Sequence, residues 1–306
     1  MGSLVFRIAG GGSSTCADGS WVTGTTGSAG VGNITSNYAL EFDGSNDYVD
    51  VSDCATDWRG VANFSFVCWY WADSYPASSD NTPPTLFSVL SDDNASRINF
   101  YFQGNTYVSN LRKGFAVGMF GGDGSSAANY GSHYAWIGNL PTYPLSKPAK
   151  EGQWNHIALS YTGGGSTSSE IVQIWINGIK HSTTNANGEW SNSYSGDSSI
   201  STPEYLYSSL GTTFDKSYIG RGDAGVNGAD TCYFDGKIDQ LATWDVSITN
   251  TDVLNLFSGT LAPSALSASD LITYYNFAEG AGNSTTADSS GNGYTGTLTN
   301  MDTGSC

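Results

Sequence analysis

Four aspartates stand in turns or near strand ends, where their carboxylates could bind a metal ion. Asp43 and Asp47 lie in the turn F-D-G-S-N-D, Asp239 follows Ile238 in G-K-I-D, and Asp235 in Y-F-D-G is a weaker addition. Calcium takes about six to eight oxygen ligands, and Asp-rich turns supply both carboxylates and backbone carbonyls. The alternative is local turn chemistry, because an aspartate side chain also accepts hydrogen bonds from its own backbone.

Aromatic side chains form a second set of candidates, for binding sugars. Aromatic ring faces pack against the C–H surface of a sugar, so exposed rings on a sheet would form a stacking platform. The candidates lie on two predicted strands and in one polar loop; they are Trp69, Trp71, Trp175, Trp190 and Tyr194. The alternative is that long loops cover the strand tryptophans and that the loop aromatics hold their own loop in place.

Nucleophilic catalysis has no local motif in this sequence. The three histidines are dispersed, and no Ser-His-Asp or Cys-His pattern is present. The cysteines have no C-x-x-C spacing, which argues against a structural zinc site. Cys68 lies within a predicted strand and is expected to be buried. The other four could form two disulfides or remain thiols; they are Cys16, Cys54, Cys232 and Cys306.

The composition favours strands and turns over helices. Of the 306 residues, 13% are aromatic and 13% are charged, and glycine occurs 39 times. The net charge of −17 argues against nucleic acid and anionic membranes as partners, because binding either needs lysine and arginine. No apolar run is long enough to span a membrane. The N-terminal segment lacks the basic start of a signal peptide.

A predicted β-hairpin at residues 151–180 is the clearest element that could position these side chains. Trp154 to Thr162 alternates between polar and apolar residues. Ile171 to Ile176 places its aliphatic side chains on one face and Trp175 on the other, because strand side chains alternate. Asn177-Gly178 follows at once and is a strong hairpin-turn signal.

Further strands and one helix are predicted on both sides of this hairpin. Tyr38 to Val51 reads as two strands around the Asp43-Gly44 turn, and Phe64 to Trp71 is apolar on both faces, as in a central strand. Ser247 to Phe257 reads as a short helix that Thr249 or Asn250 would cap. Four more short strands are predicted near Leu86–Leu90, Ile98–Gln103, Phe115–Phe120 and Tyr134–Ile137.

Several motifs resemble those of the laminin-G-like, concanavalin A-like jelly-roll family. They are Y-A-L-E-F-D-G-S-N-D-Y-V-D-V from Tyr38, G-Q-W-N-H-I-A from Gly152, Y-F-D-G-K-I-D-Q-L from Tyr233 and L-I-T-Y-Y-N-F-A-E-G from Leu271. The resemblance implies an all-β, concanavalin A-like jelly-roll sandwich of two antiparallel sheets with one short helix. The last motif precedes the first in the common arrangement, so the resemblance implies a circularly permuted order.

These readings predict a simple domain organisation. Residues 1–37 would form a Gly/Ser-rich N-terminal arm, and residues 38–306 a single jelly-roll domain. Within that domain, residues 71–150 would form enlarged loops and extra strands. Residues 271–300 would supply C-terminal strands in permuted order.

The resemblance also implies roles for individual residues. In the family, the F-D-G-x-x-D turn and the I-D strand often lie close together and hold a structural Ca²⁺, which here would involve Asp43, Asp47 and Asp239. His156 stands where the family has a structural histidine. Arg221-Gly222-Asp223 matches an integrin-binding tripeptide, but it coincides with the family's I-G-R strand end, which explains the arginine without a receptor.

Glycosidases of the laminarinase type share this fold and carry E-x-D-x-E on one strand. The closest segment here, Glu41-Phe42-Asp43, lacks the third acid. The predicted function is therefore non-enzymatic. A glycoside hydrolase remains the least favoured alternative.

The C-terminal motif, ending G-T-L-T-N-M, resembles marine bacteriophage virion proteins. We therefore predict a virion structural or decoration protein, on the capsid surface or the tail. Its partners would be other virion proteins, copies of itself and a cell-surface glycan, without nucleic acid or membrane insertion. The alternative is a secreted, extracellular carbohydrate-binding or adhesion domain.

Overall fold

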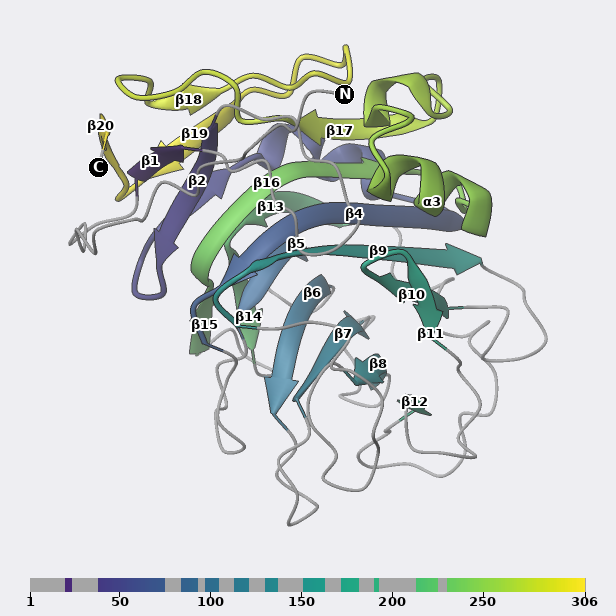
Figure 1. The fold of residues 1–306 in the computed structure, drawn as a ribbon. Coiled ribbons are helices and arrows are strands. Elements are labelled where there is room, and N and C mark those ends of the chain that lie inside the picture. Colours follow the sequence, from purple (N-terminus) through teal and green to yellow (C-terminus); the bar gives the residue numbers. More distant parts are fainter. Residues whose placement is uncertain are drawn as a thin grey trace, which may run out of the picture.

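Two nine-stranded sheets, stacked face to face, make up the chain in a computed structural model (Figure 1). The structure describes residues 20–23, 38–74, 84–92, 97–104, 113–120, 130–136, 151–162, 172–181, 190–192, 213–224 and 230–305. With mainly antiparallel strands and little helix, the described chain confirms the predicted all-β sandwich.

Sheet A has the strand order β11-β10-β9-β4-β16-β2-β1-β20, with β17 also pairing with β16. Its strands are β11 (Ile179–His181), β10 (Val172–Ile176), β9 (Trp154–Thr162), β4 (Asn63–Ala72), β16 (Asp235–Trp244), β2 (Tyr38–Asp43), β1 (Ser20–Thr23), β20 (Asp302–Ser305) and β17 (Leu271–Tyr275).

Sheet B has the order β12-β8-β7-β6-β5-β13-β3-β19-β18. Its strands are β12 (Trp190–Asn192), β8 (Tyr130–Trp136), β7 (Lys113–Phe120), β6 (Arg97–Gly104), β5 (Thr85–Ser91), β13 (Phe214–Ile219), β3 (Tyr48–Asp50), β19 (Gly296–Thr299) and β18 (Thr285–Thr286). A separate two-stranded ribbon joins β14 (Arg221–Ala224) to β15 (Asp230–Tyr233).

Aromatic side chains fill the core between the two sheets. Phe66 of β4 stacks on Phe100 of β6, with ring centroids 4.4 Å apart, and also lies against Phe87 and Phe115 of sheet B. The short 3-10 helix η1 (Ser52–Trp58) closes one end of this core with Trp58. Such ring clusters add edge and stacking contacts to ordinary apolar burial.

A second apolar layer covers the outer face of sheet A. Helix α3 (Asn250–Phe257) and the segment after it, which includes the 3-10 helix η3 (Pro263–Ala265), pack Val253 and Leu256 against Trp175 and Trp244 (Figure 1). Thr249 caps the helix through a reciprocal capping box with its third residue, as the sequence suggested. The centre of sheet A is therefore buried on both faces, and the two-faced apolar pattern predicted for β4 is confirmed.

The predicted hairpin is present with its predicted turn. β9 covers Trp154–Thr162 and β10 covers Val172–Ile176, and Asn177 and Gly178 both have positive φ, at 52° and 75°. This turn conformation matches the twist of the two strands it joins.

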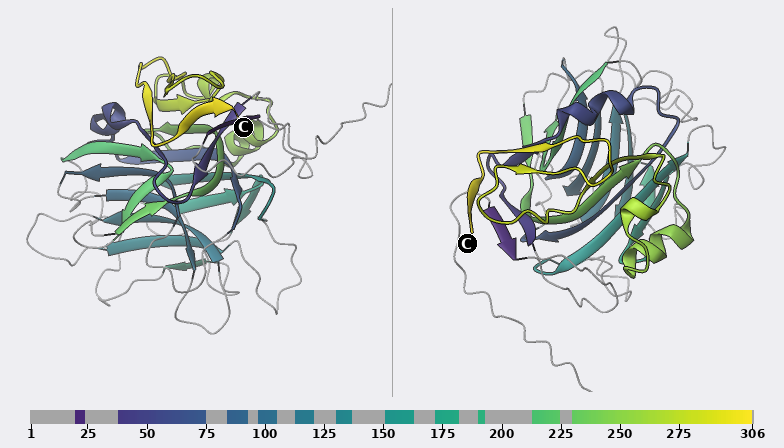
Figure 2. Two further views of the ribbon diagram at one scale, coloured as in Figure 1. Left: turned by 90° about the vertical axis from the view of Figure 1, so that its left-hand side faces the viewer. Right: turned by 90° about the horizontal axis from the view of Figure 1, so that it is seen from above.

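Segments from both ends of the chain complete the sheets. β17 pairs with β16 in sheet A, and β19 pairs with β3 in sheet B, so strands from 271–300 extend both layers (Figure 2). β1, inside the predicted N-terminal arm, pairs with β2 and with β20. The arm predicted for residues 1–37 therefore contributes a strand to sheet A, because Trp21 and Val22 meet Leu40 and Ala39 in register.

Cys54 and Cys68 are buried free thiols, and Cys232 is buried on β15. Cys54, one of the four cysteines that could form a disulfide or remain a thiol, is a thiol in the structure. Burial raises the pKa of this thiol to about 12. Cys16 and Cys306 lie outside the described residues. No helix in the described part of the chain is long and apolar enough to cross a membrane.

The Asp288 carboxylate organises the C-terminal turn D-S-S-G-N-G-Y. Its oxygens accept hydrogen bonds from the backbone N–H groups of Tyr274, Ser290, Gly293 and Tyr294. Backbone donors to an ionised carboxylate make stronger bonds than neutral pairs do. This one side chain therefore ties β17 to the turn that leads into β19.

Replacing this carboxylate tests whether the C-terminal strands belong to the cooperative fold. We expect Asp288→Asn to lower the free energy of unfolding by about 2–3 kcal/mol, because an amide cannot satisfy all of these donors. Asp53→Asn is the matched control, since Asp53 is exposed and accepts no hydrogen bond within the described structure. Denaturant unfolding measures both variants, and equal stability of the two would contradict this role.

Candidate functional site

The outer face of sheet B carries polar and aromatic side chains in two rows that the strand register sets. One row runs across β3, β13, β5 and β6 and comprises Asp50, Tyr218, Ser88 and Asn99. The next row comprises Lys216, Leu90 and Arg97. The core side chains of these strands, such as Phe87 and Phe100, point to the opposite face, because strand side chains alternate.

The strand β14 lies over this face. Ser88 Oγ donates a 2.7 Å hydrogen bond to the Arg221 carbonyl, and Asn99 Nδ2 donates a 3.0 Å hydrogen bond to the Asp223 carbonyl. A side chain at Gly222 would clash with Thr85, whose Oγ1 lies 2.6 Å from the position of a Cβ. These contacts fix the backbone of Arg221 and Asp223 against sheet B.

The Arg221 guanidinium is held between two tyrosine rings. Its Cζ lies 4.8 Å from the ring centroid of Tyr48 and 4.5 Å from that of Tyr218. The two rings meet edge to face, with centroids 5.3 Å apart. Cation–π contacts with both rings stabilise the guanidinium in this orientation.

The described residues offer this guanidinium no hydrogen-bond acceptor. Its nearest carboxylate oxygen, Asp223 Oδ1, is 3.8 Å away, which is too far for a hydrogen bond. Within the described residues no acceptor takes a hydrogen bond from Arg221, although its side chain is only 21% exposed. Asn99 Oδ1, also buried, accepts none either.

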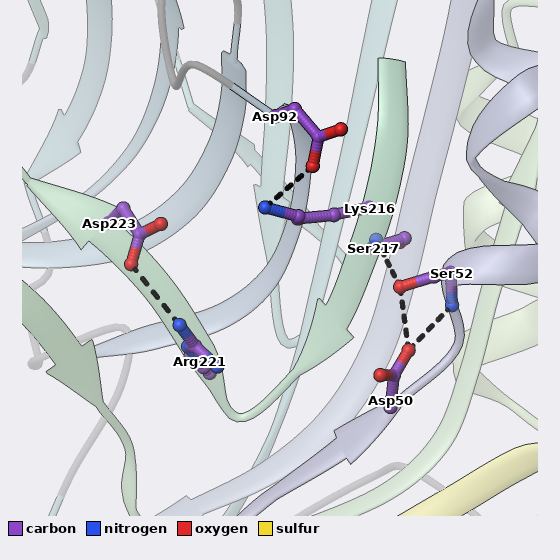
Figure 3. A network of polar contacts seen from close by, with 7 residues as sticks. All are labelled: Asp50, Ser52, Asp92, Lys216, Ser217, Arg221 and Asp223. Atoms are coloured by element: carbon purple, nitrogen blue, oxygen red, sulfur yellow. Dashed lines mark hydrogen bonds and ion pairs between the residues drawn. The ribbon is translucent and has the colours of Figure 1, made fainter. Parts of the chain in front are cut away.

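Further charged side chains lie near Arg221 and Asp223 (Figure 3). Lys216 Nζ lies 2.8 Å from Asp92 Oδ1 at the exposed side of the face. Asp50 accepts hydrogen bonds from the backbone N–H and the hydroxyl of Ser52, whose hydroxyl oxygen accepts one from the Ser217 N–H. The half-exposed side chains Tyr48, Asp50, Lys216 and Arg221 are those that a ligand can reach.

Burial and mutual charge shift the pKa values of this face. Burial raises the pKa of Asp223, and the positive charges of Arg221, Arg97 and Lys216 oppose that shift. The hydrogen bond to Asp92 raises the pKa of Lys216. Three basic side chains therefore surround one buried carboxylate, in a chain where acids outnumber bases by 28 to 11.

Three of the tryptophans predicted to bind sugars, Trp69, Trp71 and Trp175, lie on sheet A. Trp69 is 4% exposed and stacks on Phe257 of α3, and Trp175 is fully buried with its Nε1 donating to Asn250 Oδ1 at 2.7 Å. These two rings therefore have no free face for a sugar. The physical reason is α3, which covers this side of sheet A.

Trp71 is the predicted aromatic that stays half-exposed. Its Nε1 donates to Asp73 at 2.9 Å, and Lys237 Nζ lies 5.4 Å from its ring centroid. The backbone of Trp190 forms β12, whose side chains the structure does not describe, and Tyr194 lies outside the described residues.

Three of the four aspartates predicted to hold calcium accept hydrogen bonds from nearby backbone N–H groups. Asp43 Oδ1 accepts hydrogen bonds from the backbone N–H groups of Ser45 and Asn46, while Asp47 Oδ2 accepts one from Asp43 N–H. Asp239 Oδ1 accepts one from the N–H of Gln240, at a bulge in β16 where Gln240 has positive φ.

The pairing of β16 with β2 also places Asp239 far from Asp43 and Asp235. Asp235 lies opposite Asp43, but Asp239 is four residues further along β16, about 13 Å away at the rise of a strand. In the part of the chain described, no three acidic, histidine or cysteine side chains are placed to hold a metal ion. The present geometry thus favours turn chemistry, and calcium binding stays a prediction.

The sequence analysis missed Tyr48, Tyr218 and Lys216 as candidates, and it read Arg221 only as the end of a strand. The available signal was the pattern Tyr218-Ile219-Gly220-Arg221-Gly222-Asp223, where aromatic, cationic and acidic side chains stand close together in the sequence. The integrin-type tripeptide is not displayed for a receptor, because Asp223 is 5% exposed and Arg221 is held by two rings.

No protein-family model and no curated protein matches this chain. Among solved structures, tailspike protein 2 from an Escherichia coli bacteriophage is 15% identical over 79% of this chain, with a TM-score of 0.47, and this chain spans 27% of its length. A pentraxin from Limulus polyphemus is 13% identical, with 65% of this chain and 70% of that chain covered and a TM-score of 0.36.

A candidate carbohydrate-binding protein from Bacteroides ovatus is 14% identical, with 86% of this chain and 61% of that chain covered and a TM-score of 0.38. At such identities and TM-scores, the likeness to these proteins carries no argument about activity or ligands. The functional argument therefore depends on the geometry of sheet B.

His156 provides a test of the packing beneath α3. It is buried beside Trp69 and Phe257, and burial lowers its pKa from 6.5 to about 3. Below pH 6.5 this histidine takes up a proton in the unfolded chain but not in the folded chain. Its contribution to the free energy of unfolding therefore decreases by about 1.4 kcal/mol for each unit by which the pH is lowered toward 3.

We expect His156→Leu to lose less stability than the wild type as the pH falls from neutral to about 4, because leucine does not titrate. Denaturant midpoints at several pH values measure this difference. The other titrating groups are shared by both proteins and cancel in the comparison. Parallel pH profiles would contradict the burial of a neutral histidine.

Calcium binding at the Asp43 turn has an equally direct test. The separation of the carboxylates predicts the same melting temperature in excess Ca²⁺ and in excess EDTA. Differential scanning fluorimetry of wild type and Asp43→Asn makes the comparison. A Ca²⁺-dependent rise in melting temperature that Asp43→Asn abolishes would restore the calcium interpretation.

Proposed function

We propose that this chain is a non-enzymatic carbohydrate-binding β-sandwich that holds its ligand on the outer face of sheet B. The observation that carries the proposal is the Arg221 guanidinium between Tyr48 and Tyr218, which donates no hydrogen bond to any of the described residues. Sugar sites combine an aromatic surface for C–H faces with a few fixed polar groups for hydroxyls. Tyr48, half-exposed, supplies the ring, and Arg221, Asp50 and Lys216 supply the polar groups.

Preorganisation supports the same proposal. These side chains stand on strands or on the strand β14, which Ser88 and Asn99 anchor to the sheet. Groups already held in place lose little conformational entropy when a ligand binds. The half-exposed Trp71 on sheet A is a less suitable site for a sugar. Lys237 already lies over its ring and pairs with Glu41 at 2.8 Å, so neither the ring nor the lysine is free for a ligand.

Binding without turnover fits the carboxyl pair on this side of the molecule. The Asp215 side chain is hydrogen-bonded to Asp92, and burial and this neighbour raise the pKa of Asp215. Glycosidase carboxyls lie about 5–10 Å apart, on either side of the bond they cleave. Two carboxyls in direct contact do not have that spacing. The virion setting stays a prediction from the sequence.

A glycan array tests the proposal. We expect the wild type to bind a defined set of glycans without hydrolysing them, and Tyr48→Ala to weaken binding at least about tenfold through loss of the central ring. Tyr38→Ala, at an exposed tyrosine on sheet A, is the matched control and should bind as the wild type does. Circular dichroism confirms that each variant is folded.

Two results would overturn this proposal. One is the absence of any glycan ligand for the folded wild type. The other is loss of binding in Trp71→Ala with full binding in Tyr48→Ala, which would move the site to sheet A.

A further inference from the structure

We infer that the glycan bound at this face is acidic, and that Arg221 recognises its carboxylate or sulfate group. The inference rests on the proposed function and adds the chemical class of the ligand. The starting observation is that a rigidly held arginine has no hydrogen-bond acceptor among the described residues. A guanidinium presents its N–H donors in a planar fork that matches an oxyanion in bidentate geometry.

The orientation of Arg221 makes this capacity specific. Its two ring contacts, at 4.8 and 4.5 Å, hold the guanidinium in place, while 21% of the side chain stays exposed to a ligand. The backbone carbonyls of Arg221 and Asp223 are tied to Ser88 and Asn99, so the backbone that carries this side chain is fixed. Among the described residues, no carboxylate forms a short ion pair with Arg221.

The charges around Arg221 point the same way. Lys216 and Arg97 lie near enough to Asp223 to act on its pKa, so three cations share one region of a strongly acidic chain. Four acids also lie near this region, and one of them, Asp215, stands beside Asp92 and Lys216. Asp223 is buried at 5% exposure, Asp92 is paired with Lys216 at 2.8 Å, and Asp50 is bonded to Ser52.

Each of these carboxylates thus has a partner or is shielded, whereas Arg221 is half-exposed and has no hydrogen-bond acceptor among the described residues. Elsewhere in the described chain, basic side chains are already engaged. Lys237 pairs with Glu41, and Lys180 bonds to Gln173 at 2.8 Å. An oxyanion carried by a sugar would complete the Arg221 fork, while Tyr48 packs against the sugar ring.

Calorimetric titration with three defined oligosaccharides tests this inference. An N-acetyllactosamine oligosaccharide is neutral, its keratan sulfate counterpart adds only sulfate, and a hyaluronan oligosaccharide carries only carboxylates. We expect at least one acidic ligand to bind about tenfold more tightly than the neutral one, as charge-assisted hydrogen bonds allow. The two acidic arms distinguish sulfate from carboxylate.

Arg221→Gln should reduce acidic binding to the level of the neutral sugar, and Arg221→Lys should retain part of it, because charge remains but the fork is lost. Lys237→Gln is the control, since its side chain is similarly exposed at 23% and lies on sheet A. Raising the salt concentration from about 0.05 to 0.5 M should weaken the wild type and not Arg221→Gln.

The outcomes separate this inference from the proposed function. Equal binding of neutral and acidic sugars, with Arg221→Gln as tight as the wild type, overturns the acidic ligand and leaves carbohydrate binding intact. Failure of the folded wild type to bind any of the three sugars or any glycan on the array overturns both.

Discussion

Sheet A must be covered on both faces, and the rest of the structure depends on that constraint. Its central strand β4 presents Phe66 and Tyr70 to one side and Val67 and Trp69 to the other, and all four are buried. One face packs on sheet B, and the other needs a further layer, since exposed apolar surface on this scale is unfavourable in water. Helix α3 and the residues that follow it supply that layer.

The position of the polar face follows from this arrangement. With the centre of sheet A covered on both faces, polar side chains gather on the outer face of sheet B, where Ser88 and Asn99 are buried and Tyr48 is half-exposed. There the register brings together Asp50, Tyr218 and Asn99 from strands far apart in the sequence. The ribbon strand β14 then adds Arg221 and Asp223, bound in place by side chains of that row. The order of the layers therefore determines both the fold and the position of the candidate site.

The sequence predicted the elements well because their signals are local. The alternation of side chains predicted the strands β9, β10 and β4. Asn177-Gly178 predicted the hairpin turn, and Thr249 predicted the start of α3. The candidate site was largely missed because alternation separates two faces of a strand without showing which face another layer covers. Trp69 and Trp175 were assigned to an open face that α3 in fact occupies.

Hydrogen–deuterium exchange of the full chain, with and without a bound acidic oligosaccharide, shows directly which sheet holds the ligand. We expect slower exchange in peptides covering β3, β13 and β14, where the ligand would contact Tyr48 and Arg221, and unchanged exchange in β4 and α3. Protection confined to β4, β10 or α3 would contradict it, because the ligand would then lie on the enclosed sheet.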